Sequence, residues 1–100
     1  MKMYRYDQHI DENGSVTVRL LKFNVIRETA CGVWVSLWPG KKRFINTNAR
    51  KQFAYSTIEQ AREAFIARKR RHIAILDYQL ECALIALNHA LDGQYDDQAN

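Results

Sequence analysis

Residues 56–93 read STIEQAREAFIARKRRHIAILDYQLECALIALNHALDG and decide the fold. The run Ser56-Thr-Ile-Glu59 is typical of a capping box, in which the serine oxygen accepts a hydrogen bond from an N–H of the first turn. No glycine or proline follows until Gly93, which can adopt the left-handed conformation that ends a helix. The sequence therefore predicts one helix of about 50 Å. A compact chain of this size has a radius of gyration of only about 13 Å, so the helix should extend beyond its own domain.

An apolar stripe follows this helix in steps of seven residues. We expect it to form an interface between subunits, made by Ile66, Ile73, Leu76, Leu80, Leu84, Leu87 and Leu91. From Ile73 onward the apolar arc widens, and such a helix must be covered on more than one side. The pattern favours pairing of helices between copies of the chain, in a homo-oligomer that is a dimer or higher. The alternative is a bend near Arg68–Arg71, so that two shorter helices pack together in a monomer.

The residues before the helix alternate like the strands of an antiparallel sheet. Strands are predicted at 2–10, 16–26, 33–38 and 43–46, and a further one at 53–55, with turns at Asn13-Gly14 and Pro39-Gly40. The apolar residues of the second strand change phase, which predicts a β-bulge near Leu20–Leu21. The predicted fold class is α+β in a single domain. It has a small antiparallel β-meander over 1–55, one face of which lies against a long C-terminal α-helix over 56–93, and an acidic tail over 94–100.

Composition and charge limit the classes of function. The chain of 100 residues has no apolar run that could span a bilayer and no leader of the signal-peptide type, so we expect a soluble, cytoplasmic protein with no membrane association. Its two cysteines and three histidines have no metal-binding or redox spacing, so no metal and no cofactor is predicted.

The net charge of +4 is unevenly distributed along the chain. Residues 41–72 carry ten Lys or Arg against two Asp or Glu, whereas residues 73–100 carry no Lys or Arg and five Asp or Glu. A basic block of this density either meets an anionic partner or is neutralised by the acidic end of another copy.

The candidate ligand-binding residues come from this block and from two nearby tryptophans. They are Lys41, Lys42, Arg43, Arg50, Lys51, Arg68, Arg70, Arg71, Trp34 and Trp38. Arginine and lysine suit phosphate, and the tryptophans, with Phe44 and Tyr55, could stack on bases. The alternative is that the basic side chains are solvated or pair with Asp77, Glu81 and Asp92 of an antiparallel copy, while the aromatic rings form the core beneath the helix.

The sequence contains no recognisable catalytic motif. The sequence has no Gly-rich phosphate loop, no nucleophile elbow and no pair of metal ligands. We therefore predict no catalytic residues, and we expect that the protein is not an enzyme.

Several short runs between residues 25 and 91 carry a likeness to known sequences. They are Arg27-Glu-Thr29, Gly32-Val-Trp34-Val35, Lys41-Lys-Arg-Phe44, Ala49-Arg-Lys51, Phe53-Ala-Tyr55 with Thr57, Phe65 followed by Ala67-Arg-Lys69, Ile75-Leu76 and Gln79-Leu80. Through these runs the chain resembles a family of small bacteriophage and prophage proteins with no assigned activity. It has Ser56 where similar proteins often have proline, which changes the helix cap. The resemblance implies a phage-encoded protein that works inside a bacterial cytoplasm.

Small phage proteins without enzymatic motifs mostly act by binding, and many of them counter host defences. By this association we predict a non-catalytic counter-defence protein whose basic block binds or sequesters a phosphate-bearing ligand, either a nucleotide signal or nucleic acid. One alternative is an anti-CRISPR-like inhibitor that docks on a host defence protein complex. Another is a structural or assembly protein.

Overall fold

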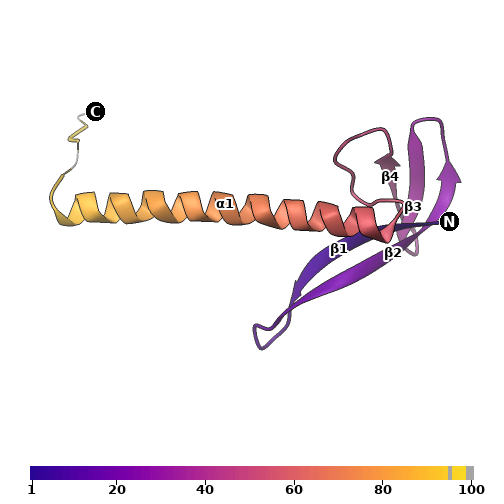
Figure 1. The fold of residues 1–100 in the computed structure, drawn as a ribbon, viewed down its shortest axis with the longest axis horizontal. Helices are drawn as coiled ribbons and strands as arrows, with labels where there is room; N and C mark the ends of the chain where they lie inside the picture. Colours follow the sequence, from indigo (N-terminus) through magenta and orange to yellow (C-terminus); the bar gives the residue numbers. More distant parts are fainter. Residues whose placement is uncertain (95, 99–100) are drawn as a thin grey trace. The chain divides into compact units, whose positions relative to one another are not determined.

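Four antiparallel strands and one long helix make up the fold (Figure 1). The computed structural model describes residues 1–94 and 96–98. Its elements are β1 (Lys2–Ile10), β2 (Val16–Glu28), β3 (Gly32–Trp38), β4 (Lys41–Asn46) and α1 (Ile58–Leu91). The strands pair in sequence order, β1-β2-β3-β4, as a meander. The predicted α+β fold class is confirmed.

The chain forms two compact units, and the boundary between them falls within α1. The first unit, Met1–Ala67, holds the sheet and the first turns of the helix, and the second, Arg68–Asn100, holds the rest. The helix itself runs from Ile58 to Leu91 as one element. This continuity is expected because the segment has no glycine or proline and the run Arg68–Arg71 consists of good helix formers. The alternative of two separate helices is therefore wrong.

The N-terminal cap of α1 lies one residue later than predicted. The Gln60 N–H donates to Thr57 Oγ1 at 3.1 Å, and the Ser56 hydroxyl donates to Gln60 Oε1 at 3.2 Å. Thr57 is therefore the N-cap residue and Ser56 is not. The cap hydrogen bond joins the Thr57 hydroxyl to the N–H three residues later, as is typical of an N-cap threonine.

The C-terminal end of α1 has the predicted glycine stop. Gly93 has a φ of 71°. The Gln94 and Gly93 N–H groups donate to the His89 and Ala90 carbonyl oxygens at 2.7 and 3.2 Å, which is a Schellman motif. Of the predicted tail, Gln94 and residues 96–98 lie outside helix and strand. The rest of the tail lies outside the described residues.

The β1–β2 hairpin has the predicted turn but lacks the predicted bulge. Asp11 Oδ1 accepts hydrogen bonds from the Asn13 and Ser15 N–H groups at 2.9 and 2.8 Å, and Gly14 has a φ of 82°. Pairing then runs without a shift from Ile10↔Val16 to Lys2↔Asn24, so there is no bulge at Leu20–Leu21. The two apolar sets of β2 lie on opposite faces of one regular strand. The shift occurs instead between Val25 and Arg27, where β2 pairs with β3.

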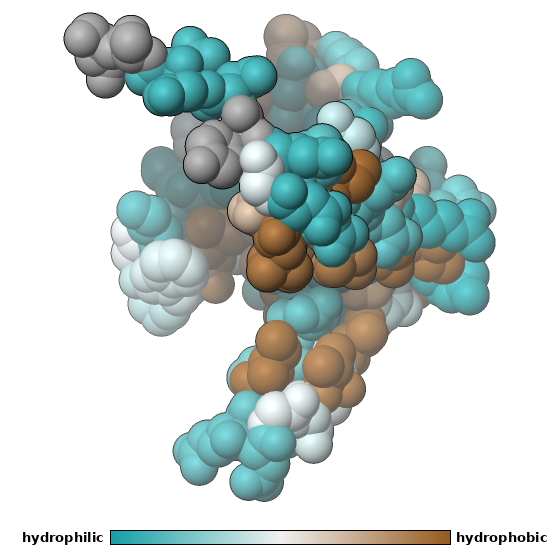
Figure 2. Space-filling view, turned by 90° about the vertical axis from the view of Figure 1, so that its left-hand side faces the viewer, coloured by the Kyte–Doolittle hydropathy of each residue, from teal (hydrophilic) through white to brown (hydrophobic). Residues whose placement is uncertain are grey.

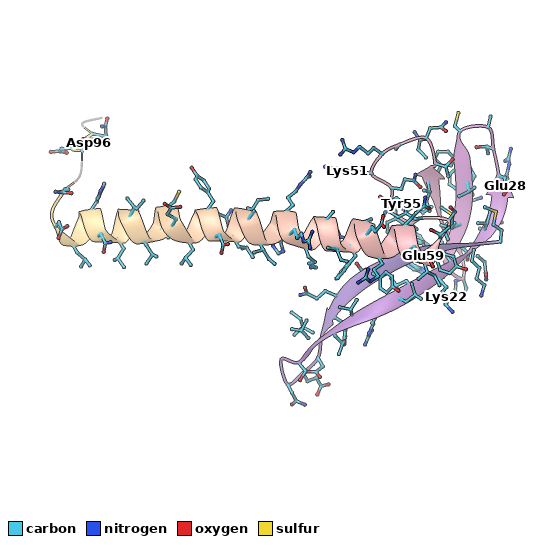
Figure 3. The ribbon with its side chains drawn as sticks, viewed as in Figure 1. Lys22, Glu28, Lys51, Tyr55, Glu59 and Asp96 are labelled. Carbon is cyan, nitrogen blue, oxygen red and sulfur yellow. The ribbon has the colours of Figure 1, made fainter. Side chains whose placement is uncertain are left out.

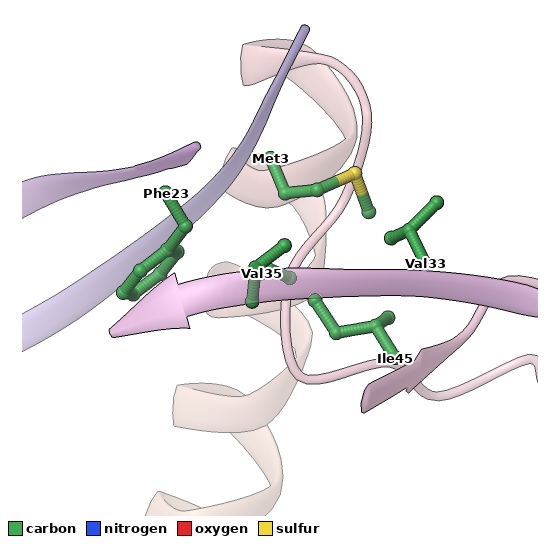
Figure 4. Close-up of a cluster of buried hydrophobic side chains, with 6 residues drawn as sticks. Met3, Phe23, Val33, Val35 and Ile45 are labelled. Carbon is green, nitrogen blue, oxygen red and sulfur yellow. The ribbon is translucent and has the colours of Figure 1, made fainter. Parts of the chain in front are cut away.

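One face of the sheet, which we call the core face, carries the buried side chains. Met3, Phe23, Val33, Val35 and Ile45 form the cluster (Figure 4), together with Ala54. These strand residues share a face because the register pairs Met3 with Phe23 and Val33 with Ile45. Leu21, Val25, Leu37 and Phe53 are partly buried and pack against the cluster.

The core face is covered by the segment between β4 and α1. Ala54 is fully buried, and the Phe53 ring lies 5.4 Å from the Phe23 ring. Among the described residues, no side chain of α1 belongs to the core cluster. The first turns of α1 contribute the buried Ala61 and a contact between the Phe65 and Tyr6 rings, with centroids 6.3 Å apart. The turns of α1 that belong to the first unit therefore do not cover the core face, contrary to the prediction.

The same segment pairs with the free edge of β1. The Tyr4 N–H donates to the Tyr55 carbonyl oxygen at 2.7 Å, and the Tyr55 N–H donates to the Tyr4 carbonyl oxygen at 2.8 Å. The strand predicted at 53–55 is thus a single antiparallel bridge. It protects an edge that would otherwise present unpaired backbone groups.

Replacing Gly32 with alanine should destabilise the sheet. A Cβ at this position would lie 2.0 Å from the Ile45 carbonyl oxygen and 2.9 Å from Phe44 Cζ. The first contact is with backbone, so the β3–β4 ladder must shift, and we expect a loss of about 1–3 kcal/mol in the free energy of unfolding. Urea denaturation followed by tryptophan fluorescence measures it. The exposed neighbour change Cys31→Ala is the control, and equal stability of both variants would contradict the close approach.

The position of the N-cap can be tested with two single substitutions. Thr57→Ala removes the acceptor of the Gln60 N–H and should cost about 1 kcal/mol, measured by chemical denaturation followed by circular dichroism at 222 nm. Ser56→Ala removes only an exposed bond between two side chains, so its effect should stay within about 0.5 kcal/mol. The reverse order of effects would return the cap to Ser56.

Candidate ligand-binding site

The outer face of the sheet, opposite the core face, carries a row of aromatic and cationic side chains. Because Val33 and Val35 point into the core, Trp34 and Ser36 of β3 point outward. The register pairs Trp34 with Arg27 of β2 on one side and with Phe44 of β4 on the other. Directly paired residues share a face, so these three side chains cross the sheet in one line.

Lys42 adds a second cation beside this row. It pairs with Ser36, and its Nζ lies 5.6 Å from the centre of the Trp34 ring. The Trp34 and Phe44 rings have centroids 5.3 Å apart and are tilted by 55°. Trp34 is half-buried and Phe44 is 37% exposed. We call Arg27, Trp34, Lys42 and Phe44 the outer-face cluster.

The bulge in β2 places Arg27 in this cluster. Regular antiparallel pairing from Val25↔Val35 would bring Ile26 opposite Trp34 and would send Arg27 to the core face. The register shift instead pairs Arg27 with Trp34. A bulge that re-aims one side chain in this way is common next to functional sites. The sequence gives no signal for it, because simple alternation assigns Arg27 to the wrong face.

Arg43 belongs to the core face and not to the outer-face cluster. It pairs with Val35, and its Cζ lies 4.0 Å from the centre of the Phe53 ring. Arg5 lies over the same ring at 4.7 Å, and its Nη1 donates to the Phe53 carbonyl oxygen at 2.7 Å. Strand alternation therefore divides the predicted basic run Lys41–Arg43 between two faces. Arg43 holds the segment that closes the core.

The other predicted residues of the first unit lie around the sheet. Trp38 pairs with Lys41 beyond a register shift between Ser36 and Trp38, and it is 59% exposed. Arg50 and Lys51 are exposed in the segment between β4 and α1, and Lys51 is labelled there in Figure 3. Tyr55 pairs at the β1 edge of the sheet, whereas Phe44 lies on β4 at the other edge. Tyr55 is therefore not part of the aromatic group.

Arg68, Arg70 and Arg71 belong to the second compact unit. Arg68 is half-buried, while Arg70 and Arg71 are exposed on α1. Of the ten predicted ligand-binding residues, Trp34 and Lys42 are the two that the structure brings together in the outer-face cluster, with Arg27 and Phe44 added. The sequence already points to Phe44 as a stacking residue, and it lies two residues after Lys42 in β4, on the same face.

Over residues 1–94 and 96–98, no three His, Cys, Asp or Glu side chains lie where they could share a metal ion. Cys31 and Cys82 are both free and exposed. None of the helix within the described residues is long and apolar enough to cross a membrane.

Comparison with models of known protein families, with curated proteins and with solved structures gave no significant match to this chain. Inference of function therefore depends on the chemistry of the outer-face cluster.

The division of the basic run between faces predicts different effects of neighbouring substitutions. Arg43→Ala removes a guanidinium stacked on Phe53 and should lower the free energy of unfolding by about 1 kcal/mol. Lys42→Ala removes an exposed cation and should change it by less than about 0.5 kcal/mol. Urea denaturation of the two variants makes the comparison. If Lys42→Ala were the more damaging change, the assignment of faces would be wrong.

Proposed function

We propose that the outer-face cluster binds a phosphate-bearing ligand that also carries a nucleobase, either single-stranded nucleic acid or a nucleotide. The observation that supports this most is the Trp34–Phe44 ring pair, which has the Lys42 ammonium 5.6 Å from the Trp34 ring and Arg27 paired with Trp34 on the neighbouring strand, on a face that the core does not use. Stacking of a base on an aromatic ring is worth about 1–3 kcal/mol and tolerates any sequence. Arginine and lysine beside the rings suit the phosphates.

The charge around the cluster supports an anionic ligand. Lys42 lies beside Trp34, and Lys41 precedes it at the start of β4, where it pairs with the exposed Trp38. Within the first unit, residues 41–67 carry six Lys or Arg against two Asp or Glu. A surface of this sign raises the local concentration of anions and speeds their association.

The proposed role is binding without catalysis. The resemblance to small phage proteins suggests a protein that acts in the cytoplasm of a bacterial host and that counters a defence by sequestering a nucleotide signal or by covering nucleic acid. This setting is an argument by association. The ligand chemistry is argued from the cluster and from the basic residues near it.

A second candidate is an inhibitor that docks on a host defence protein complex. The observation that favours it is Trp38, which is 59% exposed at the end of β3. A tryptophan at a protein surface is a frequent anchor of protein–protein interfaces. In this case Trp38→Ala should abolish binding to the partner, whereas substitutions in the outer-face cluster should leave it intact.

Binding of a fluorescently labelled oligothymidylate and of single nucleotides, measured by anisotropy at low salt, tests the main proposal. Trp34→Ala should weaken binding by a factor of about 5 to 150, as expected from the loss of one stacked base. Lys42→Ala should weaken binding and lower by about one the slope of log affinity against log salt. Phe44→Leu keeps the side chain apolar and should also weaken binding.

The control for this experiment is Tyr78→Ala. Tyr78 is an aromatic residue of α1 that is 68% exposed and lies outside the cluster, so its loss should leave the affinity unchanged. Circular dichroism verifies that each variant is folded. Absence of binding to both oligonucleotide and nucleotides at low salt, or equal effects of Trp34→Ala and Tyr78→Ala, would refute the proposed function.

A further inference from the structure

The second unit exposes an unusual amount of apolar side chain on its helix. Every residue from Arg71 to Leu91 is exposed. Nine large apolar side chains among them are 47–74% exposed, namely Ile73, Ile75, Leu76, Tyr78, Leu80, Leu84, Ile85, Leu87 and Leu91. Figure 2, which looks at the molecule from the side of the helix C-terminus, shows hydrophobic side chains at the surface. Helices in proteins are stabilised mainly by packing of an apolar face, so this helix requires a cover.

The apolar residues follow the spacing of a helix pair. Ile73, Leu80 and Leu87 form one row in steps of seven, and Leu76, Ala83 and Ala90 form the second row three residues on. Leu84 and Leu91 extend the stripe along the same side. Two rows in these positions make the seam of a two-helix coiled coil, in which each side chain fits between side chains of the facing helix. The natural cover is therefore another helix of the same period.

The distribution of charge along the helix favours a second copy of the same helix in antiparallel orientation. Arg70 and Arg71 mark the basic start of this segment, and from Ile73 onward its charged residues are the acidic Asp77, Glu81 and Asp92. Two such helices in parallel would place basic turns beside basic turns. In an antiparallel pair, the basic start of each helix faces the acidic end of the other, which is favourable.

The side chains match in one antiparallel register. If the pair is centred between Glu81 and Cys82, Arg71 lies opposite Asp92 of the partner. The same centre places Leu76 opposite Leu87, Ile73 opposite Ala90 and Leu80 opposite Ala83, as follows from their positions in the sequence. Large side chains then face small ones, or each other, along the two rows of seven, while Leu84 and Leu91 beside these rows lie opposite Gln79 and His72 of the partner.

We propose that residues 70–92 of α1 pair in antiparallel orientation with the same segment of a second copy of this chain. A second copy is the partner because both the apolar rows and the charges of this helix match those of an identical helix that runs in the opposite direction. This inference does not use the outer-face cluster, so it stands or fails independently of the proposed function. Ile75, Tyr78 and Ile85 lie off the seam, which allows two pairs to associate into a bundle of four helices.

The oligomeric state of the full chain is the first test. Light scattering of the chain, whose mass is 11.7 kDa, should give a mass of two chains or a multiple of two. Leu80→Glu places a charge in the middle of the seam and should raise the dissociation constant at least about 100-fold. Asn88→Glu is the matched control, because it adds the same charge seven residues from Glu81 on the polar side, and it should leave the mass unchanged. A monomer at all concentrations, or equal behaviour of the two variants, would overturn the proposal.

Disulfide trapping tests the orientation without destabilising the helix. In a chain with Cys31→Ser and Cys82→Ser, the single changes Leu76→Cys and Leu87→Cys are made separately. In the proposed register these positions face each other, so oxidation of a mixture of the two chains should give covalent dimers, while each chain alone should give few. Dimers from each chain alone would indicate parallel pairing and would overturn the antiparallel register. No covalent dimer in any sample would do the same.

Discussion

The packing of Phe53 and Ala54 on the core face of the sheet is the interaction on which the other features depend. A four-stranded sheet has one apolar face to bury, and here a short irregular segment buries it. The two main-chain bonds between Tyr4 and Tyr55, at 2.7 and 2.8 Å, hold that segment along the edge of β1. Because the core face is already closed, the apolar side chains of α1 are not needed there.

The same packing explains how the basic residues divide. The Phe53 ring that closes the core is itself covered by two guanidinium groups. The Cζ atoms of Arg43 and Arg5 lie 4.0 and 4.7 Å from the centre of the ring. Arg43 therefore has a structural role on the core face, although it belongs to the most basic run of the first unit. The alternation of β4 then leaves Lys42 on the outer face with Trp34. The second cation of the outer face is Arg27, which the bulge in β2 pairs with Trp34.

Features that depend on residues close in sequence were predictable, and features that depend on long-range register were not. The Asn13-Gly14 turn, the helix and its stop at Gly93 follow from local preferences of the residues involved. The strand phase of Val33 and Val35 follows from alternation. The bulge between Val25 and Arg27 depends on how β3 pairs with β2, and the role of Phe53 depends on which segment packs on the core face. Neither is encoded in a local pattern, so both the cover of the core and the place of Arg27 were missed.

The proposed ligand site and the proposed helix pairing together determine how a polymeric ligand would bind. Pairing of α1 with a second copy gives an assembly with at least two outer-face clusters, whatever their separation. A single nucleotide can occupy only one cluster, so its affinity is that of one site. A strand long enough to reach two clusters gains from their effective concentration, and its affinity can exceed that of one site by 10²–10⁴-fold. The ratio of affinities for long and short ligands therefore distinguishes binding of nucleic acid from binding of a small nucleotide. If the ligand is a polymer, helix pairing contributes to binding. If the ligand is a nucleotide, helix pairing contributes to the stability of the protein alone.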